Sequence, residues 1–237
     1  MDINVALSPE KRAQILDGAA AVFAADGYEG ASMARIAAVA GVSKGTLYNH
    51  FDSKAALFTA YVVEKCNQNL AHIFDGANHD GDPAEVLRGI GKRMVRMMLS
   101  TVGLEIYRVV TAEAAKFPDL ARGFFESGPA RAIGFMAGWL AEETRRGRLA
   151  VPDPAFAAEQ FFHLCQTGLV LRRRLEMLPD PSENDIDHVV DASIAMFLRT
   201  YRAQSQPLPA RPADSGPSIA SHAQTGGPDT PGHDNGG

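Results

Sequence analysis

The sequence of 237 residues predicts an all-α fold. Apolar residues recur three, four and seven positions apart along most of the chain, which is the spacing of one face of an α-helix. This pattern is seen in Ile15, Ala19, Val22 and Phe23, in Val86, Ile90, Met94, Met97 and Met98, and in Phe156, Phe161, Leu164, Cys165 and Leu169. Alternation of Val, Ile or Thr with polar residues between hairpin turns, which would indicate strands, is absent.

Helix-breaking residues divide the chain into about nine or ten expected helices. Ser8-Pro9 opens the first helix, and Asp26-Gly27-Tyr28 closes it. Gly41 interrupts a short Ala-rich helix, and Asp52-Ser53 precedes a long one. The run from Asp75 to Pro83 is an expected loop. Later breaks are expected at Phe117-Pro118, Gly128-Pro129, Pro152 to Pro154 and Pro179-Asp180-Pro181.

The composition limits which classes of protein the chain can belong to. The chain is 46% hydrophobic, so it can bury a core, and its net charge of −5 does not by itself suggest a nucleic-acid binder. Net charge is a sum over the whole chain, however, whereas DNA is met by one local face. The N-terminus resembles no export signal, and no apolar run reaches the length of a membrane span. We therefore expect a soluble cytoplasmic protein without membrane contact.

Two cysteines, Cys66 and Cys165, lie far apart in apolar stretches. No Cys-x-x-Cys pair and no Cys/His cluster with zinc spacing occurs, so we expect buried reduced thiols and neither metal nor cofactor. From residue 204 the helical pattern stops, and residues 207–237 contain six Pro and six Gly. Such a segment buries too little surface to offset its ordering entropy, so 204–237 is predicted to be a disordered tail.

Residues 32 to 51 have the residue types of two helices joined by a short turn. Ser32 can cap the first helix and Ser43 the second, because each hydroxyl can accept from an unpaired backbone N–H. Gly41 can take the positive φ that a sharp turn requires, and Val42 can fill the corner. The first helix would be buried through Ile36, Ala37 and Ala40.

The second helix breaks two local rules in adjacent residues. Leu47 and Phe51 are four apart and must face inward, which turns the remaining side chains outward or to the flanks. Lys44 lies in the first turn, where the helix dipole disfavours a cation, and Gly45 is exposed in a helix. Such departures tend to mark functional sites. An ordinary polar surface, with Gly45 as a packing concession, remains the alternative from periodicity alone.

The stretch from Ile15 to Leu57 resembles the DNA-binding domain of the TetR family of regulators. The residues that carry the resemblance are Ile15-Leu16, Ala19-Ala20, Phe23, Gly27-Tyr28, Ser32-Met33, Ile36-Ala37, Ala40 to Tyr48, His50-Phe51, Ser53-Lys54 and Leu57. The resemblance implies a helix-turn-helix domain over residues 8–54, followed by a ligand-sensing and dimerisation domain over residues 55–203. It also implies that the partner is double-stranded DNA with a palindromic operator.

The resemblance further implies which side chains meet DNA. The expected contacts are Ser32, Arg35, Ser43, Lys44, Gly45, Thr46, Tyr48, Asn49, His50 and Lys54. Thr46 and Asn49 are the expected base readers, and Ser32, Arg35 and Lys54 are expected to hold phosphates. Arg35, Lys44 and Lys54 against Asp52 give a local charge of +2. The acidic residues Asp17, Asp26 and Glu29 are expected to face away.

Residues Ile106 to Leu120, followed by Phe124, Gly128-Pro129 and Gly147 to Leu149, resemble the AefR-like C-terminal branch of this family. Candidate residues of an apolar ligand pocket are Met94, Met97, Met98, Phe117, Phe124, Phe125, Phe135, Trp139, Phe162 and His163. For most of them, packing in the core is the favoured interpretation. For His163 we favour a core histidine, and for Arg108 and Glu113 a structural pair.

Dimerisation is expected because one recognition helix reads few bases, so such domains usually bind two half-sites. The resemblance places the contact on the last two long helices, about 155–178 and 182–202. The residues expected to give them an apolar surface are Phe156, Gln160, Phe161, Leu164, Gly168, Leu171, Val189, Ile194, Phe197 and Leu198. The run Arg172-Arg173-Arg174 is interpreted first as a solvated helix end and second as a contact to DNA or an acidic ligand.

The sequence favours a repressor that a small apolar or amphipathic effector releases from its operator. The alternative is a DNA-binding regulator controlled by a protein partner or lacking an effector. An enzyme is not expected. Gly89-Ile90-Gly91-Lys92 lacks the remaining residues of a phosphate-binding loop, and no catalytic motif occurs. Glu142 and Glu143 are adjacent, so they should point to different sides of a helix and form a poor catalytic pair.

Overall fold

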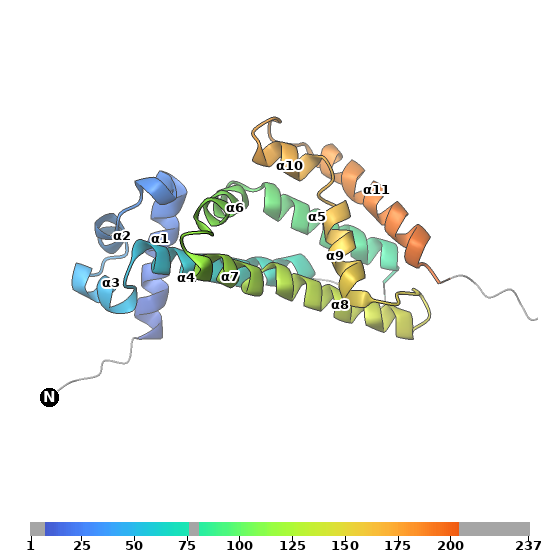
Figure 1. Ribbon diagram of the computed structural model, residues 1–237, viewed down its shortest axis with the longest axis horizontal. Helices are drawn as coiled ribbons and strands as arrows, with labels where there is room; N and C mark the ends of the chain where they lie inside the picture. Colours follow the sequence, from blue (N-terminus) through green and yellow to red (C-terminus); the bar gives the residue numbers. More distant parts are fainter. Residues whose placement is uncertain (1–7, 76–80, 204–237) are drawn as a thin grey trace, which may run out of the picture. The chain divides into compact units, whose positions relative to one another are not determined.

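The structure, a computed structural model, describes residues 8–75 and 81–203 and confirms the all-α fold within them (Figure 1). Eleven helices follow one another in these ranges: α1 Pro9–Gly30, α2 Met33–Val39, α3 Lys44–His50, α4 Lys54–Phe74, α5 Pro83–Leu99, α6 Thr101–Glu113, α7 Pro118–Ser127, α8 Pro129–Arg145, α9 Pro154–Leu164, α10 Leu169–Arg174 and α11 Glu183–Tyr201. The same residues contain no β-strand, only an isolated bridge between Leu149 and Arg202. The predicted tail and most of the predicted loop before Pro83 lie outside the described residues.

The expected helix starts are confirmed by side-chain caps. The Ser8 hydroxyl accepts from the backbone N–H of Lys11, and the Ser53 hydroxyl accepts from that of Ala56. The expected end of the first helix needs one refinement. Gly27 takes φ 68° and kinks α1, and one further turn follows to Gly30 before the helix ends.

The helix expected over about 155–178 is wrong, because the chain bends inside it. Gly168 adopts φ 70°, which a residue with a side chain rarely takes, and it separates α9 from α10. The last helix is confirmed as α11, with a capping box in which Ser182 and Asp185 exchange hydrogen bonds. None of the helices described here is long and apolar enough to cross a membrane.

Buried side chains form two separate clusters. The first, which we call the N-terminal core, contains Ile15, Leu16, Ala19, Val22, Phe23, Tyr28, Ala31, Ile36, Ala37, Leu47, Phe51, Leu57, Phe58, Tyr61, Val62, Cys66, Ile106, Val109, Val110 and Leu120. These residues come from α1 to the middle of α4, from α6 and from the start of α7. The buried face of α6 therefore belongs to the same cluster as the helix-turn-helix, together with residues of α4 and α7.

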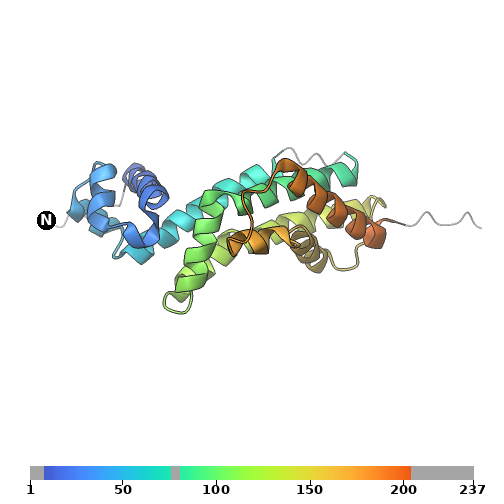
Figure 2. The same ribbon diagram turned by 90° about the horizontal axis from the view of Figure 1, so that it is seen from above.

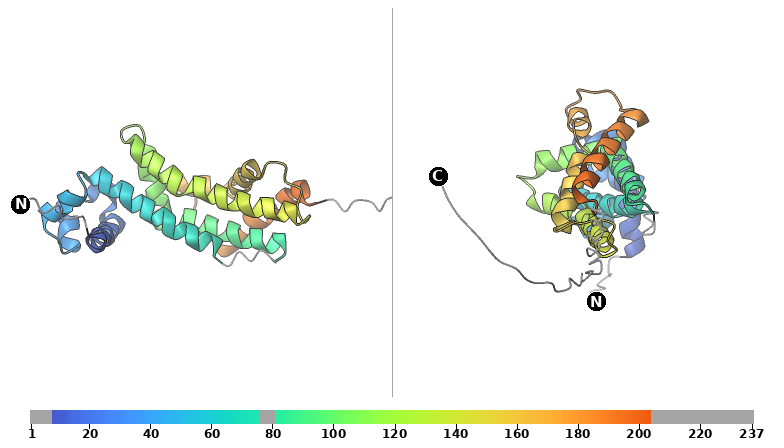
Figure 3. Two further views of the ribbon diagram at one scale, coloured as in Figure 1. Left: turned by 90° about the horizontal axis from the view of Figure 1, so that it is seen from below. Right: turned by 90° about the vertical axis from the view of Figure 1, so that its right-hand side faces the viewer.

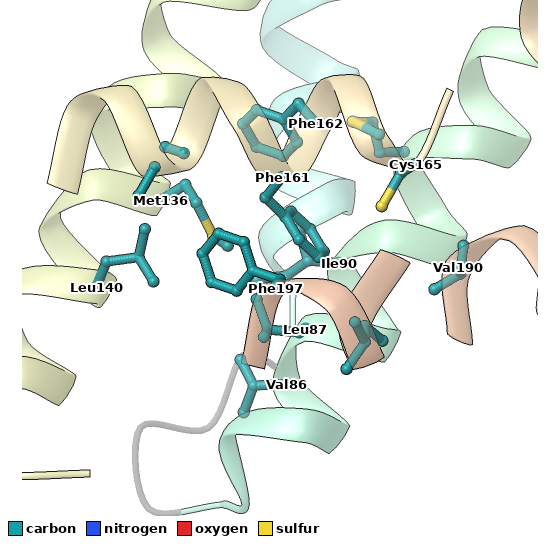
Figure 4. Close-up of a cluster of buried hydrophobic side chains, with 14 of the residues drawn as sticks. Val86, Leu87, Ile90, Met136, Leu140, Phe161, Phe162, Cys165, Val190 and Phe197 are labelled. Atoms are coloured by element: carbon teal, nitrogen blue, oxygen red, sulfur yellow. The ribbon is translucent and has the colours of Figure 1, made fainter. Parts of the chain in front are cut away.

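The second cluster, which we call the C-terminal core, is built from the end of α4 and from α5, α8, α9, α10 and α11. Figure 4 shows its centre, where Phe161 and Phe197 lie near Ile90 and Leu87, and the centre of the Phe162 ring lies 5.9 Å from that of Phe161. The Phe161 and Phe197 rings meet edge to face, with centroids 5.4 Å apart. Most of the helices after residue 83 are held together by this cluster.

Two helix pairs connect distant parts of the chain. α4 packs against α7, and the two lie side by side with α8 continuing in the same direction (Figure 3). α5 packs against α11, and the two are adjacent in Figure 2. Gly91 makes the second pair close, because a Cβ there would lie 3.0 Å from the Val190 side chain.

An ion-pair ladder runs along the seam between α5 and α11. Cations four residues apart on α5 each pair with an acidic residue four residues apart on α11: Arg88 with Asp191, Lys92 with Asp187, and Arg96 with Glu183. Residue numbers rise along one helix as they fall along the other, so the helices are antiparallel. The ladder thereby specifies the register of α11 on α5.

Candidate nucleic-acid interface

The predicted two-helix unit is present as α2 and α3. The Ser32 hydroxyl accepts from the N–H of Arg35 at 3.2 Å, and the Ser43 hydroxyl accepts from that of Thr46 at 3.0 Å. Gly41 has φ 65°, as the turn requires. Each of these predictions is confirmed, and together they present α3 as a short helix after a sharp turn.

The inward face of α3 is also as predicted. Leu47 is fully buried and Phe51 nearly so, and both join the N-terminal core. Sequence reasoning missed how closely α1 approaches α2. A Cβ on Gly18 would lie 2.6 Å from the Ala40 side chain and 2.8 Å from its backbone, and the Gln14 amide donates to the Ala40 carbonyl at 2.6 Å. Only glycine at position 18 permits this separation.

The outward face of α3 presents polar groups to solvent. Lys44, Gly45, Tyr48 and Asn49 are exposed, with Tyr48 49% exposed. The nearest atom to a Cβ built on Gly45 is the Ser43 hydroxyl at 3.8 Å, so the space above Gly45 is open. Packing against the described residues therefore does not require a glycine at position 45. Its missing side chain leaves the helix backbone accessible from outside.

Thr46 and His50 lie on the flanks of this face and are half-buried. The Thr46 hydroxyl is 2.8 Å from the Ser43 hydroxyl, so it is engaged within the helix cap. Base reading by the Thr46 hydroxyl would need that bond to open, whereas its methyl group remains available. The Asn49 side chain, the other expected reader, is exposed.

Two of the expected phosphate contacts are already paired within the protein. The Arg35 guanidinium forms an ion pair with Asp26, with one N–O distance of 3.2 Å. The expectation that Asp26 faces away is therefore wrong, because its carboxylate reaches the Arg35 guanidinium of α2. The negative charge of Asp26 offsets the positive charge of Arg35, one of the three cations counted for the DNA-facing side.

The Lys54 ammonium lies at the end of α1. It donates to the carbonyl oxygens of Tyr28 at 2.7 Å and Ala31 at 3.2 Å, with Glu29 at 3.4 Å, and it lies 4.5 Å from the centre of the Tyr28 ring. Carbonyls left unpaired at a helix end favour such a cation. A direct phosphate contact by Lys54 stays a prediction, and it would require one of these bonds to be given up.

A carboxylate from α6 reaches the same turn. Glu105 Oε1 accepts from the backbone N–H of Tyr28 at 3.4 Å, next to the kink, and Glu105 also pairs with Arg108. The expected pair of Arg108 with Glu113 is therefore wrong. Sequence reasoning missed Glu105 because no local pattern links it to a residue 77 positions earlier.

The candidate pocket residues do not gather at one place. Met94, Trp139 and Phe162 are buried in the C-terminal core, with Met97 and Met98 packed against its edge. Phe117 and Phe124 pack against the N-terminal core instead. Phe125 and Phe135 are largely exposed.

His163 is exposed rather than a core residue, and its Nδ1 lies 2.8 Å from the Glu159 carbonyl. It lines a cavity of about 470 Å³ between α9 and α11, together with Gln160, Leu164, Thr167, Met196, Phe197, Thr200 and Tyr201. A hydrogen bond of 2.6 Å joins Tyr201 to Gln160 beside this cavity.

The surface expected for dimerisation is partly corrected. Phe161, Ile194, Phe197 and Leu198 belong to the C-terminal core, because those sides of α9 and α11 pack within the protomer. Other large apolar side chains between residues 154 and 201 are exposed: Phe156, Leu171, Leu175, Met177 and Met196. Phe156 and Leu171 are thus exposed as the predicted surface requires, and the dimer contact itself stays a prediction.

The arginine run is not a solvated helix end throughout. Arg172 is exposed, whereas Arg173 pairs with Asp180 at 2.7 Å and Arg174 lies against Tyr107 of α6. Glu142 and Glu143 point apart as expected. Glu142 pairs with Arg145, while the buried Glu143 pairs with Arg148 at 2.6 Å. In residues 8–75 and 81–203, no cluster of three or more His, Cys, Asp or Glu side chains is arranged to hold a metal ion.

A short capped helix with an exposed polar face, supported by the N-terminal core and preceded by a sharp turn from α2, has the arrangement of a helix-turn-helix DNA-binding unit. The comparisons agree with this class. Residues 15–61 match the family described as bacterial regulatory proteins, tetR family, and residues 85–203 match the AefR-like transcriptional repressor C-terminal domain. The chain belongs to the TetR family of DNA-binding transcriptional regulators, with an AefR-like C-terminal domain.

Related proteins extend over most of the chain. The HTH-type transcriptional repressor AcnR of Corynebacterium efficiens is 27% identical, over 68% of this chain and 80% of its own length. The HTH-type transcriptional repressor Rv1474c of Mycobacterium tuberculosis is 27% identical, over 74% of this chain and 92% of its own. The transcriptional activator FasR of Mycolicibacterium smegmatis is 48% identical over 61 residues, 26% of this chain and 27% of its own.

Solved structures show the same arrangement of helices. A TetR-family transcriptional regulator from Mesorhizobium loti has a TM-score of 0.76 and 28% identity, covering 81% of this chain and 97% of its own. The flavonoid-responsive regulator FrrA has a TM-score of 0.69 and 31% identity, covering 84% of this chain and 100% of its own.

Proposed function

We propose that this regulator is a homodimeric repressor that binds a palindromic operator through α3 and is released by a small apolar or amphipathic effector. The outward face of α3 carries the proposal. Lys44, Tyr48 and Asn49 are exposed on a helix whose opposite side is anchored by Leu47. Open space above Gly45 allows a phosphate backbone to approach the helix closely. A single helix of this length reads few bases, so two copies are needed for useful specificity.

The same face assigns roles to the proposed contacts. Asn49 and the Thr46 methyl group would meet base edges, because amide and methyl groups recognise adenine and thymine in the major groove. Lys44 and Tyr48 would contact phosphates and position the helix. Ser32, Arg35, Ser43, His50 and Lys54 would lie at the edges of the contact. Arg35 would exchange Asp26 for a phosphate when DNA is present.

Selection of bound fragments from a random double-stranded library, with the purified full-length protein, would identify the operator. We expect a palindromic consensus and a binding constant that falls steeply with salt concentration. Tyr48→Ala should weaken binding, whereas Phe125→Ala, which truncates an aromatic ring of similar exposure on α7, should not. Failure of a folded dimer to prefer any DNA sequence would contradict the proposal.

The proposed dimer contact is the exposed apolar face of α9 to α11. Five large apolar side chains are exposed on these helices and on the segment that joins α10 to α11, and buried apolar surface is the main driving force for association. Leu171→Asp should shift sedimentation toward the monomer and lower operator affinity. Phe125→Asp, on α7, is the matched control and should leave the dimer intact.

An effector is supported by two observations. FrrA, 31% identical over most of both chains, is by its name flavonoid-responsive. In this chain, the buried Trp139 has an indole N–H without a hydrogen-bond partner among the described residues. Because buried donors are normally paired, this donor is a candidate for a ligand acceptor. Control by a protein partner instead would be indicated if no small molecule changed operator affinity.

A further inference from the structure

Arg174 is a half-buried cation that forms no ion pair with an acidic side chain of residues 8–75 or 81–203. It ends α10, and its guanidinium carbon lies 3.4 Å from the centre of the Tyr107 ring on α6. Its Nε is buried and has no hydrogen-bond acceptor in the described part of the chain. Burial also lowers the pKa of the guanidinium, although an arginine remains charged. The stack on Tyr107 is the contact that holds this side chain.

The two neighbouring arginines show the two usual surroundings of a guanidinium, an acidic partner or water. Arg173 donates to Asp180 with two N–H groups, at 2.7 and 3.2 Å, while Arg172 is exposed to water. Arg174 has neither arrangement. Removing a guanidinium from water is unfavourable unless an anion or several acceptors replace the lost hydration, and a ring face satisfies none of its N–H groups. Arg174 therefore has the properties of an anion-binding residue whose anion is not supplied by the neighbouring side chains.

We propose that Arg174, held flat by Tyr107, is the anion-binding end of an effector site that takes an organic carboxylate. The planar guanidinium offers two parallel N–H groups along an edge, which match the two oxygens of a carboxylate. Stacking on a ring fixes the plane of the guanidinium, and the two Nη groups, which unlike Nε are not buried without a partner, form the edge that would donate to a ligand. Because the effector proposed above is a small apolar or amphipathic molecule, the anion that this site would take is an organic carboxylate rather than an inorganic ion.

This inference rests on the proposed control by an effector and gives it a route to DNA. Arg174 belongs to a helix of the C-terminal core, whereas the buried face of α6 belongs to the N-terminal core. Tyr107 receives Arg174, and Glu105, two residues earlier on α6, accepts from Tyr28 at the kink of α1. A ligand that repositions Arg174 acts on α6, and through Glu105 on the helix-turn-helix. Such coupling requires the ligand to bind the two states with different affinity.

The test uses full-length protein labelled with nitrogen-15 in arginine. The probes are benzoate, cinnamate and decanoate at millimolar concentration, each compared with its uncharged primary amide. The Nε–H resonance of Arg174, assigned by its loss in Arg174→Lys, should shift with at least one carboxylate and with no amide. The exposed Arg172 serves as the internal control and should not shift. If none of the carboxylates shifts Arg174, or if amides do so equally, the proposal is wrong.

Variants separate this site from general anion binding. Arg174→Met should weaken binding of the responsive carboxylate by tenfold or more, and Arg174→Lys should weaken it less. Arg172→Met, the matched control on the same helix, should change nothing. Tyr107→Phe keeps the ring and should retain binding, whereas Tyr107→Leu should lose it. Equal losses in the Arg172 and Arg174 variants would overturn the proposal, and thermal melting of each variant establishes that it is folded.

Operator binding distinguishes this inference from the proposed function. Arg174→Met should still select the same operator sequence, and its operator affinity, whatever its value without probe, should no longer change when the carboxylate is added. A protein that binds the carboxylate at Arg174 but prefers no DNA sequence would refute the proposed function alone. One that binds its operator but shows no carboxylate shift at Arg174 would refute this inference alone.

Discussion

The close approach of α1 to α2 makes Gly18→Ala a sharp test of how α3 is supported. A Cβ at position 18 would lie 2.6 Å from the Ala40 side chain, about 0.8 Å short of the 3.4 Å at which ordinary contact begins. The other two nearest atoms, both 2.8 Å away, belong to the Ala40 backbone, so no side-chain rotation relieves the clash. The helices must separate, and the bond from the Gln14 amide to the Ala40 carbonyl must lengthen.

The expected cost follows from two opposing terms. Overpacking of a close contact costs about 1–3 kcal/mol, and the preference of alanine over glycine inside a helix returns about 1 kcal/mol. We therefore expect Gly18→Ala to lower the free energy of unfolding by up to about 2 kcal/mol. Because Ala40 immediately precedes the turn into α3, the displacement should also reduce operator affinity.

Urea unfolding followed by circular dichroism measures the first effect, and fluorescence anisotropy with the selected operator measures the second. Gly134→Ala is the matched control, because position 134 is also inside a helix but has no atom within 4 Å of a built Cβ. The control should gain up to about 1 kcal/mol, since only the propensity term acts. If Gly18→Ala were as stable as Gly134→Ala and bound the operator normally, the argument from close helix contact would be refuted.

Three further predictions concern a cap, an ion pair and a thiol. Ser43→Ala removes the cap of α3 and should cost about 1 kcal/mol in urea unfolding, with weaker operator binding in anisotropy. Hydrogen bonds from Arg96 hold the pKa of Glu183 below its ordinary 4.5, so the stability from this pair is present above that pH and is lost as pH falls through the folded-state pKa. Glu183→Gln should therefore flatten the acid limb of stability against pH, Glu126→Gln should not, and equal acid limbs in both variants would argue against the pair. Burial raises the pKa of the Cys165 thiol to about 12, so iodoacetamide should label it only after unfolding, and rapid labelling of native protein would contradict its placement.

The features that sequence reasoning predicted correctly are those encoded within a few residues. Ser32 and Ser43 cap helices because the acceptor and its N–H lie three positions apart, and Gly41 turns because its own φ must be positive. The features that it missed depend on elements meeting in space. Nothing near Gly18 in the sequence indicates that Ala40 will press against it, and nothing near Glu105 indicates Tyr28.

The candidate pocket residues show the same limit from the other side. Met and aromatic residues at helical spacing suit a hydrophobic core and an apolar ligand pocket equally well, so their spacing alone could not distinguish core residues from pocket residues. The structure distributes them between two cores and the surface. Arg174 could not be singled out from the sequence, because it stands in a run with Arg172 and Arg173. Only the structure shows that the three side chains have different surroundings: water for Arg172, Asp180 for Arg173 and the Tyr107 ring for Arg174.

The packing of α6 changes how control of DNA binding should be understood. A boundary drawn after Lys54 treats α6 as part of the sensing domain, yet Ile106, Val109 and Val110 are buried with the helix-turn-helix. Dense packing transmits displacement within a core better than across the seam between two cores. A movement of α6 should therefore carry the recognition helix with it, while α4 crosses the seam and must bend or slide. The contacts that join the two cores, such as Arg174 on Tyr107, are then where an effector has the most leverage over operator affinity.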